Sequence, residues 1–419
     1  WIWPMSSPAL PSKNQLWLLV AAAAVILLIT SGIRLSLGLF IKPIDASAHI
    51  GIVQISFALA VTQLMWGVSQ PVTGALADKF GAWRVLLFGT LLLAIGCFSV
   101  PYFVSAGGLV VTLGILVAFG TGAGSFSVLM GQVANQTPPH MRGTASGIIN
   151  AGSSFGQFLF APILQGLIAL PLVGWTGAMY FMAGTSLLCL PLAYYLTQGN
   201  NVIKHAPAAS SAVANNQAHE TLSQATRRAL SDRNYWLLHI GFFTCGFHIA
   251  FLVTHLPMEV TLAGLGSNVA SWSLALIGLS NVVGSLFVGW CVGHFRSKYI
   301  LFWMYLSRTI LIAIFLMAPK TATTFFIFAV SLGLTWLATV PPTAATVGKL
   351  YGVKYLATLF GLVLFSHQVG GFLGAYLGGI VVDKFGNYQY MWYADMALAA
   401  LAAVLNLPIQ EPKIMKATS

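Results

Sequence analysis

The stretch Gly74-Ala-Leu-Ala-Asp78-Lys79-Phe-Gly81-Ala-Trp-Arg84 contains three charged residues where two long apolar runs meet. The runs cover roughly residues 52–77 and 83–104. A helix of about 20 apolar residues spans the hydrocarbon core of a bilayer. The stretch is therefore predicted to be a charged turn, at a membrane surface, between two membrane-spanning helices.

The same pattern continues along the whole chain of 419 residues. Hydrophobic side chains make up 58% of the chain and charged ones only 6%, whereas soluble domains have about 25% charged residues. The composition predicts an all-α membrane protein with twelve transmembrane helices and leaves no room for a large soluble catalytic domain. The twelve apolar runs lie at roughly 17–41, 52–77, 83–104, 108–134, 143–169, 176–197, 235–258, 268–293, 298–318, 322–348, 355–382 and 389–408.

One long polar segment, residues 199–234, divides the chain into two halves. The end of this segment, Thr221 to Asp232, has the pattern of a short amphipathic helix on the membrane surface. We therefore expect five parts, which are an N-terminal tail (1–16), a six-helix bundle (17–198), a cytoplasmic linker (199–234), a second six-helix bundle (235–408) and a C-terminal tail (409–419).

The net charge of +11 could indicate nucleic-acid binding, but the basic residues fall almost entirely in alternate loops. Cytoplasmic loops of membrane proteins carry an excess of Lys and Arg. We therefore expect no nucleic-acid partner, and both termini in the cytoplasm of a multi-pass protein of a bacterial inner membrane. The sparsely charged side holds Lys42, Lys320 and Lys384. The basic side holds Lys13, Lys79, Arg84, Arg142, Lys204, Arg227, Arg228, Arg233, Arg296, Lys298, Lys349, Lys354, Lys413 and Lys416.

The two halves repeat each other with a spacing of 214 residues. Ser31-Gly-Ile-Arg34 matches Cys245-Gly-Phe-His248, and the same spacing sets Gly156 on Gly370. A spacing that is constant over separate segments predicts two pseudo-symmetric six-helix bundles, the parallel repeat of a rocker-type secondary transporter. Chance matches among Gly-rich apolar helices are the alternative.

The stretch from Gly74 to Arg84 resembles the signature between helices two and three of the major facilitator superfamily. The resemblance implies a gate on the cytoplasmic side. The carboxylate of Asp78, beside the cations Lys79 and Arg84, would lock the two halves in one state and release them in the other. Gly74 would allow close helix packing and Gly81 a tight turn.

Arg142-Gly-Thr-Ala145-Ser-Gly147-Ile-Ile-Asn-Ala151-Gly152 resembles the fifth-helix motif of the monocarboxylate transporters and the oxalate/formate antiporters. The resemblance extends over essentially the whole chain. It implies that Trp336 in helix ten belongs to an aromatic cage and that His367 in helix eleven replaces a substrate-binding lysine. Asn281 and Ser285 stand where monocarboxylate transporters carry an Asp and an Arg, so a different proton-binding residue is expected here.

Arg34 and Arg308 are the two cations at membrane depth. A charge at that depth costs about 2.5–3.5 kcal/mol on insertion scales, so such residues are functional candidates. We expect Arg34 to line the cavity and to bind a substrate carboxylate. The alternative is that it snorkels outward or binds backbone carbonyls between helices. Arg308, in the peripheral ninth helix, is interpreted as a structural tie, and Asp395 as a group that pairs near the outer surface.

Three histidines, His248, His255 and His367, are the candidates for proton coupling. His248 and His255 are seven residues apart, which places them on one face of helix seven. Free histidine titrates at about pH 6.5, so a histidine in the cavity could exchange a proton in each transport cycle. A neutral histidine that bonds two helices together is the alternative. Gln368 and Asn281 could bind a polar ligand or, as amides often do, stabilise helix packing.

Helix ten contains Pro341 and Pro342 close to Trp336. Adjacent prolines free backbone carbonyls and are expected to bend the helix. A bend at this place would suit a gate beside the predicted site.

Together these features favour a secondary active transporter for a small, monocarboxylate-like organic anion, which works by alternating access and is coupled to protons. A proton-driven efflux antiporter for drugs or larger metabolites is the alternative, although Gly152-x-x-x-Gly156 lacks the following Pro of drug/proton antiporters. The predicted substrate-binding residues are Arg34, His255, Trp336, His367, Gln368 and Asn281.

An enzyme is not expected, because the sequence has no carboxylate pair, Ser/His/Asp spacing or phosphate-binding Gly loop. The four cysteines lie in apolar runs without metal-ligand spacing, so neither a metal nor a cofactor is expected. The expected partners are the lipid bilayer, the substrate and protons, and the protein is expected to function as a monomer.

Overall fold

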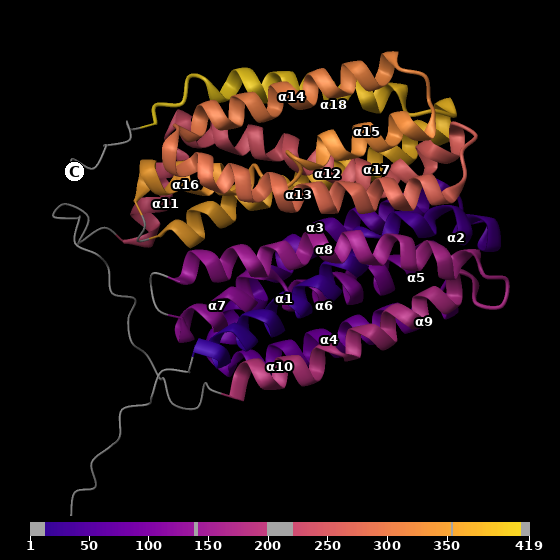
Figure 1. The fold of residues 1–419 in the computed structure, drawn as a ribbon, viewed down its shortest axis with the longest axis horizontal. Coiled ribbons are helices and arrows are strands. Elements are labelled where there is room, and N and C mark those ends of the chain that lie inside the picture. Colours follow the sequence, from indigo (N-terminus) through magenta and orange to yellow (C-terminus); the bar gives the residue numbers. More distant parts are fainter. Residues whose placement is uncertain (1–12, 138–140, 199–220, 353–354, 412–419) are drawn as a thin grey trace, which may run out of the picture.

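The computed structural model describes residues 13–137, 141–198, 221–352 and 355–411, and almost all of them are helical. Two helical bundles pack side by side, the first coloured indigo to magenta and the second orange to yellow in Figure 1. The first comprises α1 (Lys13–Leu35), η1 (Leu37–Phe40), α2 (Ile41–Ala48), α3 (Ile52–Phe80), α4 (Ala82–Ser99), η2 (Val100–Tyr102), α5 (Ala106–Leu109), the π-helical η3 (Val110–Val117), α6 (Ala118–Ala123), α7 (Phe126–Gln136), α8 (Arg142–Ala169), α9 (Gly174–Leu187) and α10 (Cys189–Thr197). The second comprises α12 (Arg233–Leu262), α13 (Ser267–His294), α14 (Ser297–Met317), α15 (Ala322–Gly333), α16 (Val340–Tyr351), α17 (Leu356–Phe385) and α18 (Gln389–Asn406).

The helices run roughly parallel to the long axis of the molecule (Figure 1). We call the end at which α11 (Leu222–Leu230) lies the basic face, and the end at which α2 lies the opposite face. Thr221 and Gln224 form a capping box at the start of α11, which lies where the sequence predicts an amphipathic helix. The first part of the predicted linker, 199–220, lies outside the described residues.

Ten helical stretches among the described residues are long and apolar enough to cross a membrane. The other two predicted spans are α18 and the pair α15 and α16. The predicted all-α class is therefore confirmed, with one correction. The tenth span, predicted as a continuous run over 322–348, is two helices separated by residues 334–339.

The bundles repeat each other as the sequence predicts. A Cβ atom on Gly156 of α8 would lie 2.1 Å from the carbonyl oxygen of Leu28, and one on Gly370 of α17 would lie 2.1 Å from that of Phe243. Only glycine permits so close an approach. The first and fifth helices of the two bundles therefore pack in the same way. The helix starts at Ile52, Arg142 and Gly174 recur 214 or 215 residues later at Ser267, Leu356 and Gln389.

The fourth helix of each bundle is interrupted at an equivalent place. α7 begins at Phe126 after a break, and α16 begins at Val340, 214 residues later. Side chains from neighbouring helices bond the freed carbonyls. Thr30 Oγ1 donates to the Gly124 oxygen at 3.1 Å, and Arg308 Nη2 donates to the Trp336 oxygen at 2.7 Å. Such breaks are tolerated at membrane depth only where the backbone finds partners of this kind.

Pro341 and Pro342 lie in the first turn of α16 instead of at a bend within a helix. Proline suits the first turn because its missing N–H has no partner to lose there. The expected bend at the prolines is thus corrected to a break that precedes them. The break at Gly124 has no proline beside it, so proline is not required for either one.

The main contacts between the two bundles are those of α3 with α17 and α12, α8 with α13, and η1 with α12. A Cβ on Gly379 would lie 2.5 Å from the Ser56 side chain, and the Phe57 ring packs edge-on against Phe372, with 6.1 Å between centroids. These contacts lie towards the opposite face. Nearer the basic face, a Cβ would meet no atom within 4 Å at Gly74, Gly147, Gly289 or Gly361.

Candidate functional site

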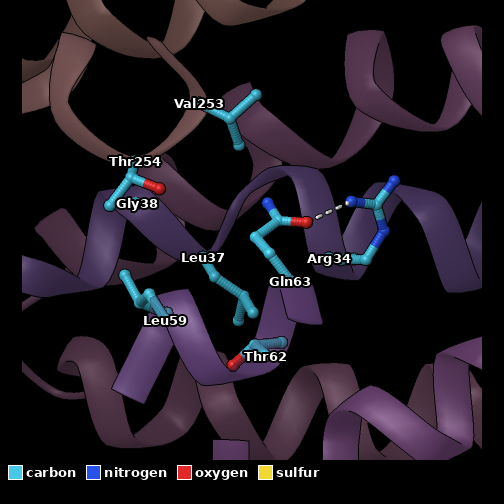
Figure 2. Close-up of a pocket in the computed structure, with 8 residues that line it drawn as sticks. All are labelled: Arg34, Leu37, Gly38, Leu59, Thr62, Gln63, Val253 and Thr254. Atoms are coloured by element: carbon cyan, nitrogen blue, oxygen red, sulfur yellow. Dashed lines mark hydrogen bonds between the residues drawn. The ribbon is translucent and has the colours of Figure 1, made fainter. Parts of the chain in front are cut away.

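Arg34 lies where α1 gives way to the 3₁₀ turn η1 and is only 8% exposed. Its Nη1 donates to Gln63 Oε1 at 3.0 Å, as Figure 2 shows. The guanidinium carbon sits 4.0 Å from the ring centroid of Trp66, within cation–π range. Among the described residues, no carboxylate forms a salt bridge with Arg34. A cation is thus held at the boundary between the bundles with only neutral partners.

Gln63 and Trp66 of α3 are functional candidates that the sequence analysis missed. They stand three residues apart and so lie on one face of the helix. Gln70 continues this face, and its buried Nε2 has no hydrogen-bond partner. A polar stripe in an otherwise apolar span is the signal that could have identified these residues from the sequence.

The second bundle contributes Gln368 and His367 of α17 to the same interface. A Cβ on Gly67, the residue after Trp66, would lie 2.1 Å from Gln368 Cγ, so the Gln368 side chain packs directly on α3. Gln368 Nε2 lies 3.3 Å from His367 Nδ1. His367 is 8% exposed, and its ring centroid is 5.0 Å from that of Phe242. The structure thus sets Arg34 and the predicted pair His367 and Gln368 along one interface.

A constriction separates Arg34 from the opposite face. A Cβ on Gly38 would lie 2.2 Å from the carbonyl oxygen of Val253, so η1 and α12 touch backbone to backbone. The space beside Arg34 is about 10 Å³, room for about one water molecule. Beyond the constriction lies a cavity of about 350 Å³, whose lining includes Lys42 and Gln165.

His248 and Trp336 lie elsewhere, inside the second bundle. His248 Nδ1 is 2.5 Å from Asp395 Oδ2, and both residues are fully buried. The ring of His248 meets that of Trp336 edge-on at 5.9 Å. The expectation that Asp395 pairs near the outer surface is therefore wrong, because Asp395 is 0% exposed and its partner is a histidine of helix seven. Arg308 does tie helix nine to its neighbours, as predicted.

Two further candidates are fully bonded within the protein. His255 Nδ1 lies 2.9 Å from the Tyr388 hydroxyl, and its Nε2 lies 2.7 Å from the Ala375 oxygen. Neither ring nitrogen of His255 is available to a ligand in this structure. Asn281 donates to Ser154 Oγ at 2.7 Å, across the boundary between the bundles, and accepts from the Leu337 N–H at 3.0 Å.

The charged turn after α3 has the predicted geometry. Gly81 alone connects α3 to α4, with a φ of +87° that favours glycine. Lys79 and Arg84 are exposed. The Asp78 backbone lies in the last turn of α3, and its side chain is outside the described structure.

The sequence model of a protein family, the Major Facilitator Superfamily, matches residues 18–318 and 263–419 of this chain. The chain belongs to this superfamily. It is 26% identical to monocarboxylate transporter 13 of Rattus norvegicus, over 95% of this chain and 90% of that protein. It is 22% identical to the oxalate:formate antiporter of Oxalobacter formigenes, over 92% and 90%. The D-xylose-proton symporter has the same fold, with a TM-score of 0.70 at 14% identity, over 95% of this chain and 98% of that one.

The chain is thus a multi-pass membrane transporter for a small molecule, not an enzyme. The predicted resemblance to monocarboxylate transporters and oxalate/formate antiporters is confirmed. No group of three or more His, Cys, Asp or Glu residues within the described ranges is placed to hold a metal ion.

Proposed function

We propose that this transporter moves a small organic anion with one carboxylate across the cytoplasmic membrane, together with a proton, by alternating access. The observation that carries the proposal is the buried cation at Arg34. A charge removed from water is costly unless it is paired. Gln63 supplies only a neutral oxygen, and it occupies the position that a substrate carboxylate oxygen would take.

The site chemistry fits a planar anion. Arginine offers paired N–H donors that match the two oxygens of a carboxylate. Trp66 supplies an aromatic wall, and Gln368 and His367 close the site from the second bundle with further hydrogen-bonding groups. Trp336, Asn281 and His255 would then act from behind these residues by holding the helices in place.

The arrangement of the bundles fits a state that is open towards the basic face. The close contacts lie towards the opposite face, and Lys79 and Arg84 of the charged turn are exposed. We assign the basic face to the cytoplasm, because Lys and Arg concentrate on the cytoplasmic side of membrane proteins. Asp78 would join the turn to the second bundle when this side closes.

Ligand-induced thermal stabilisation of the purified protein tests the anion site. A carboxylate present at 100 times its Kd stabilises the folded state by about 2.7 kcal/mol. We expect this gain with short monocarboxylates, but not with their amides or with a lipophilic cation of the kind that efflux antiporters carry. Arg34→Gln removes the gain, whereas Lys42→Gln, which removes an exposed cation of the opposite-face cavity, retains it.

Counterflow in reconstituted vesicles then tests transport of the ligands that bind. The anion site would be refuted if Arg34→Gln retained the full stabilisation by carboxylates. It would also be refuted if amides stabilised the wild type as well as acids do. Stabilisation by the lipophilic cation alone would favour the efflux alternative.

A further inference from the structure

The second bundle contains a buried polar cluster that the anion site does not use. His248 of α12 pairs with Asp395 of α18 at 2.5 Å, in a region where both are fully buried. Four polar atoms of the cluster formed by His248, Asp395, Trp336 and Arg308 have no hydrogen-bond partner, namely His248 Nε2, Asp395 Oδ1, Trp336 Nε1 and Arg308 Nε. Unsatisfied polar atoms at this depth are costly, so their grouping around one pair calls for a functional explanation.

The proton positions follow from the geometry. An ionised carboxylate can only accept hydrogen bonds, so His248 Nδ1 carries the proton that faces Asp395. In neutral histidine the other ring nitrogen, Nε2, then has a free lone pair. Nε2 is therefore the atom that can take up one further proton, and the Nδ1 bond to Asp395 stabilises the imidazolium that results.

The buried charges balance only while His248 is neutral. Arg308 lies on the other side of Trp336, where its Nη2 donates to the Trp336 oxygen and its Nη1 is 3.6 Å from Cys245 Sγ. With Arg308 positive and Asp395 negative, the net charge of the cluster is zero, and a proton on His248 raises it to plus one. The other ionisable groups on the elements around the cluster include Cys245, His255 and Glu259 on α12, Tyr305 on α14, His367 on α17 and Tyr388 beside α18. Those of α13 and α16, namely Cys291, His294, Lys349 and Tyr351, lie towards the basic face.

We propose that His248 and Asp395 form the site that binds and releases the coupled proton, with one proton carried per monovalent anion. This rests on the proposed function as an anion transporter. Helix α12 links the two sites directly, because Val253 and Thr254, five and six residues after His248, line the cavity beside Arg34. The bound anion compensates the added positive charge, so the interior remains neutral when both are bound or both are absent.

Proteoliposomes separate coupling from binding. For the wild type, a gradient of one pH unit drives about tenfold accumulation of the anion, because one pH unit is worth about 1.4 kcal/mol. A potassium diffusion potential adds nothing, since no net charge moves. Asp395→Asn abolishes this accumulation but retains exchange of internal for external substrate, because Arg308 then gives the cluster a fixed positive charge that compensates the anion, and exchange requires no change of protonation.

The matched control is His239→Gln, on the same helix. His239 is also mostly buried, but its Nδ1 partner is the Ser366 hydroxyl and not a carboxylate. This variant is expected to retain accumulation. Accumulation by Asp395→Asn would overturn the proposal, as would equal loss of exchange and accumulation in a variant with wild-type thermal stability. Accumulation driven by the diffusion potential would overturn the one-to-one ratio.

Tryptophan fluorescence gives a readout that needs no substrate. An imidazolium quenches a nearby indole, so protonation of His248 should lower the Trp336 emission as the pH falls. His248→Gln and Trp336→Phe should each remove the part of the transition that comes from Trp336, whereas Trp290, whose ring centroid is 4.3 Å from that of His294, contributes equally in all three proteins. If the wild type moves no carboxylate yet shows the transition, the proposed substrate is wrong and the proton site stands. If the wild type shows no such transition, the proton site is refuted.

Discussion

Replacement of Gly38 by alanine should force open the constriction above Arg34. The new Cβ would lie 2.2 Å from the Val253 oxygen and 2.7 Å from the Thr254 oxygen. Carbon and oxygen atoms ordinarily approach to about 3.3 Å, so η1 and α12 must separate by roughly 1 Å. Overpacking of this kind costs about 1–3 kcal/mol. The cost falls only on states closed at this point, so the equilibrium should shift about 5–150-fold towards states open at the opposite face.

A cysteine reporter measures this shift. Thr62 lines the space beside Arg34 and is 2% exposed, so Thr62→Cys should react slowly with a membrane-impermeant maleimide applied from the opposite face. The four native cysteines are buried and contribute little background. Gly38→Ala should raise the labelling rate of Thr62→Cys by about the factor of the population shift, 5–150-fold.

Gly166→Ala is the matched control, because a Cβ at Gly166 of α8 meets nothing within 4 Å. It should leave the labelling rate of Thr62→Cys unchanged. The three proteins to compare are Thr62→Cys alone, Thr62→Cys with Gly38→Ala, and Thr62→Cys with Gly166→Ala. Equal labelling rates in all three would refute the reasoning that the contact of Gly38 with α12 closes the opposite face.

Two further predictions concern stability. Asn281→Ala leaves the Leu337 N–H without its hydrogen-bond acceptor and should destabilise the protein by about 1–3 kcal/mol without weakening carboxylate binding. Thermal unfolding with and without a carboxylate ligand measures both effects. A selective loss of the stabilisation by ligand would instead place Asn281 in the binding site. Glu411 accepts bonds from Lys349 Nζ at 2.7 Å and from backbone N–H groups at the start of α14. Burial raises the pKa of Glu411, but these bonds outweigh it and hold the pKa below its ordinary value. Glu411→Gln should therefore lower the Tm by a few degrees at pH 7. The difference should begin to shrink below about pH 4.3, the ordinary pKa of glutamate, and vanish once the pH is below the lowered pKa of Glu411; a difference that persisted in stronger acid would contradict the electrostatic origin.

The fold was predictable because membrane insertion imposes constraints that a single sequence displays. Spans must be long and apolar, and their connections carry the charge. The spacing of 214 residues was visible because the close approaches at Gly156 and Gly370 admit no other residue. The break in helix ten was not visible, since residues 334–339 have the same apolar character as a helix and the backbone partner Arg308 lies on another span.

The site was predictable only in part, for a related reason. Arg34 was found because a cation is conspicuous within an apolar run, whereas Gln63 is an ordinary polar residue until its contact with Arg34 is seen. Asp395 was misplaced because depth was estimated from position along one helix. Its burial depends on packing against α12, from which His248 supplies the partner.

The interrupted fourth helices suggest how one fold can give the two bundles different tasks. In the first bundle a neutral hydroxyl, Thr30 Oγ1, bonds the free carbonyl at the break. In the second bundle the same task falls to the charged Arg308, which brings a permanent positive charge into the interior. That charge requires a counter-charge, and Asp395, paired with His248, can supply one. Arg308, which bonds the free carbonyl at the break, can therefore also make the second bundle responsive to a proton. The first bundle, which has no such cation at its break among the described residues, holds the anion at Arg34.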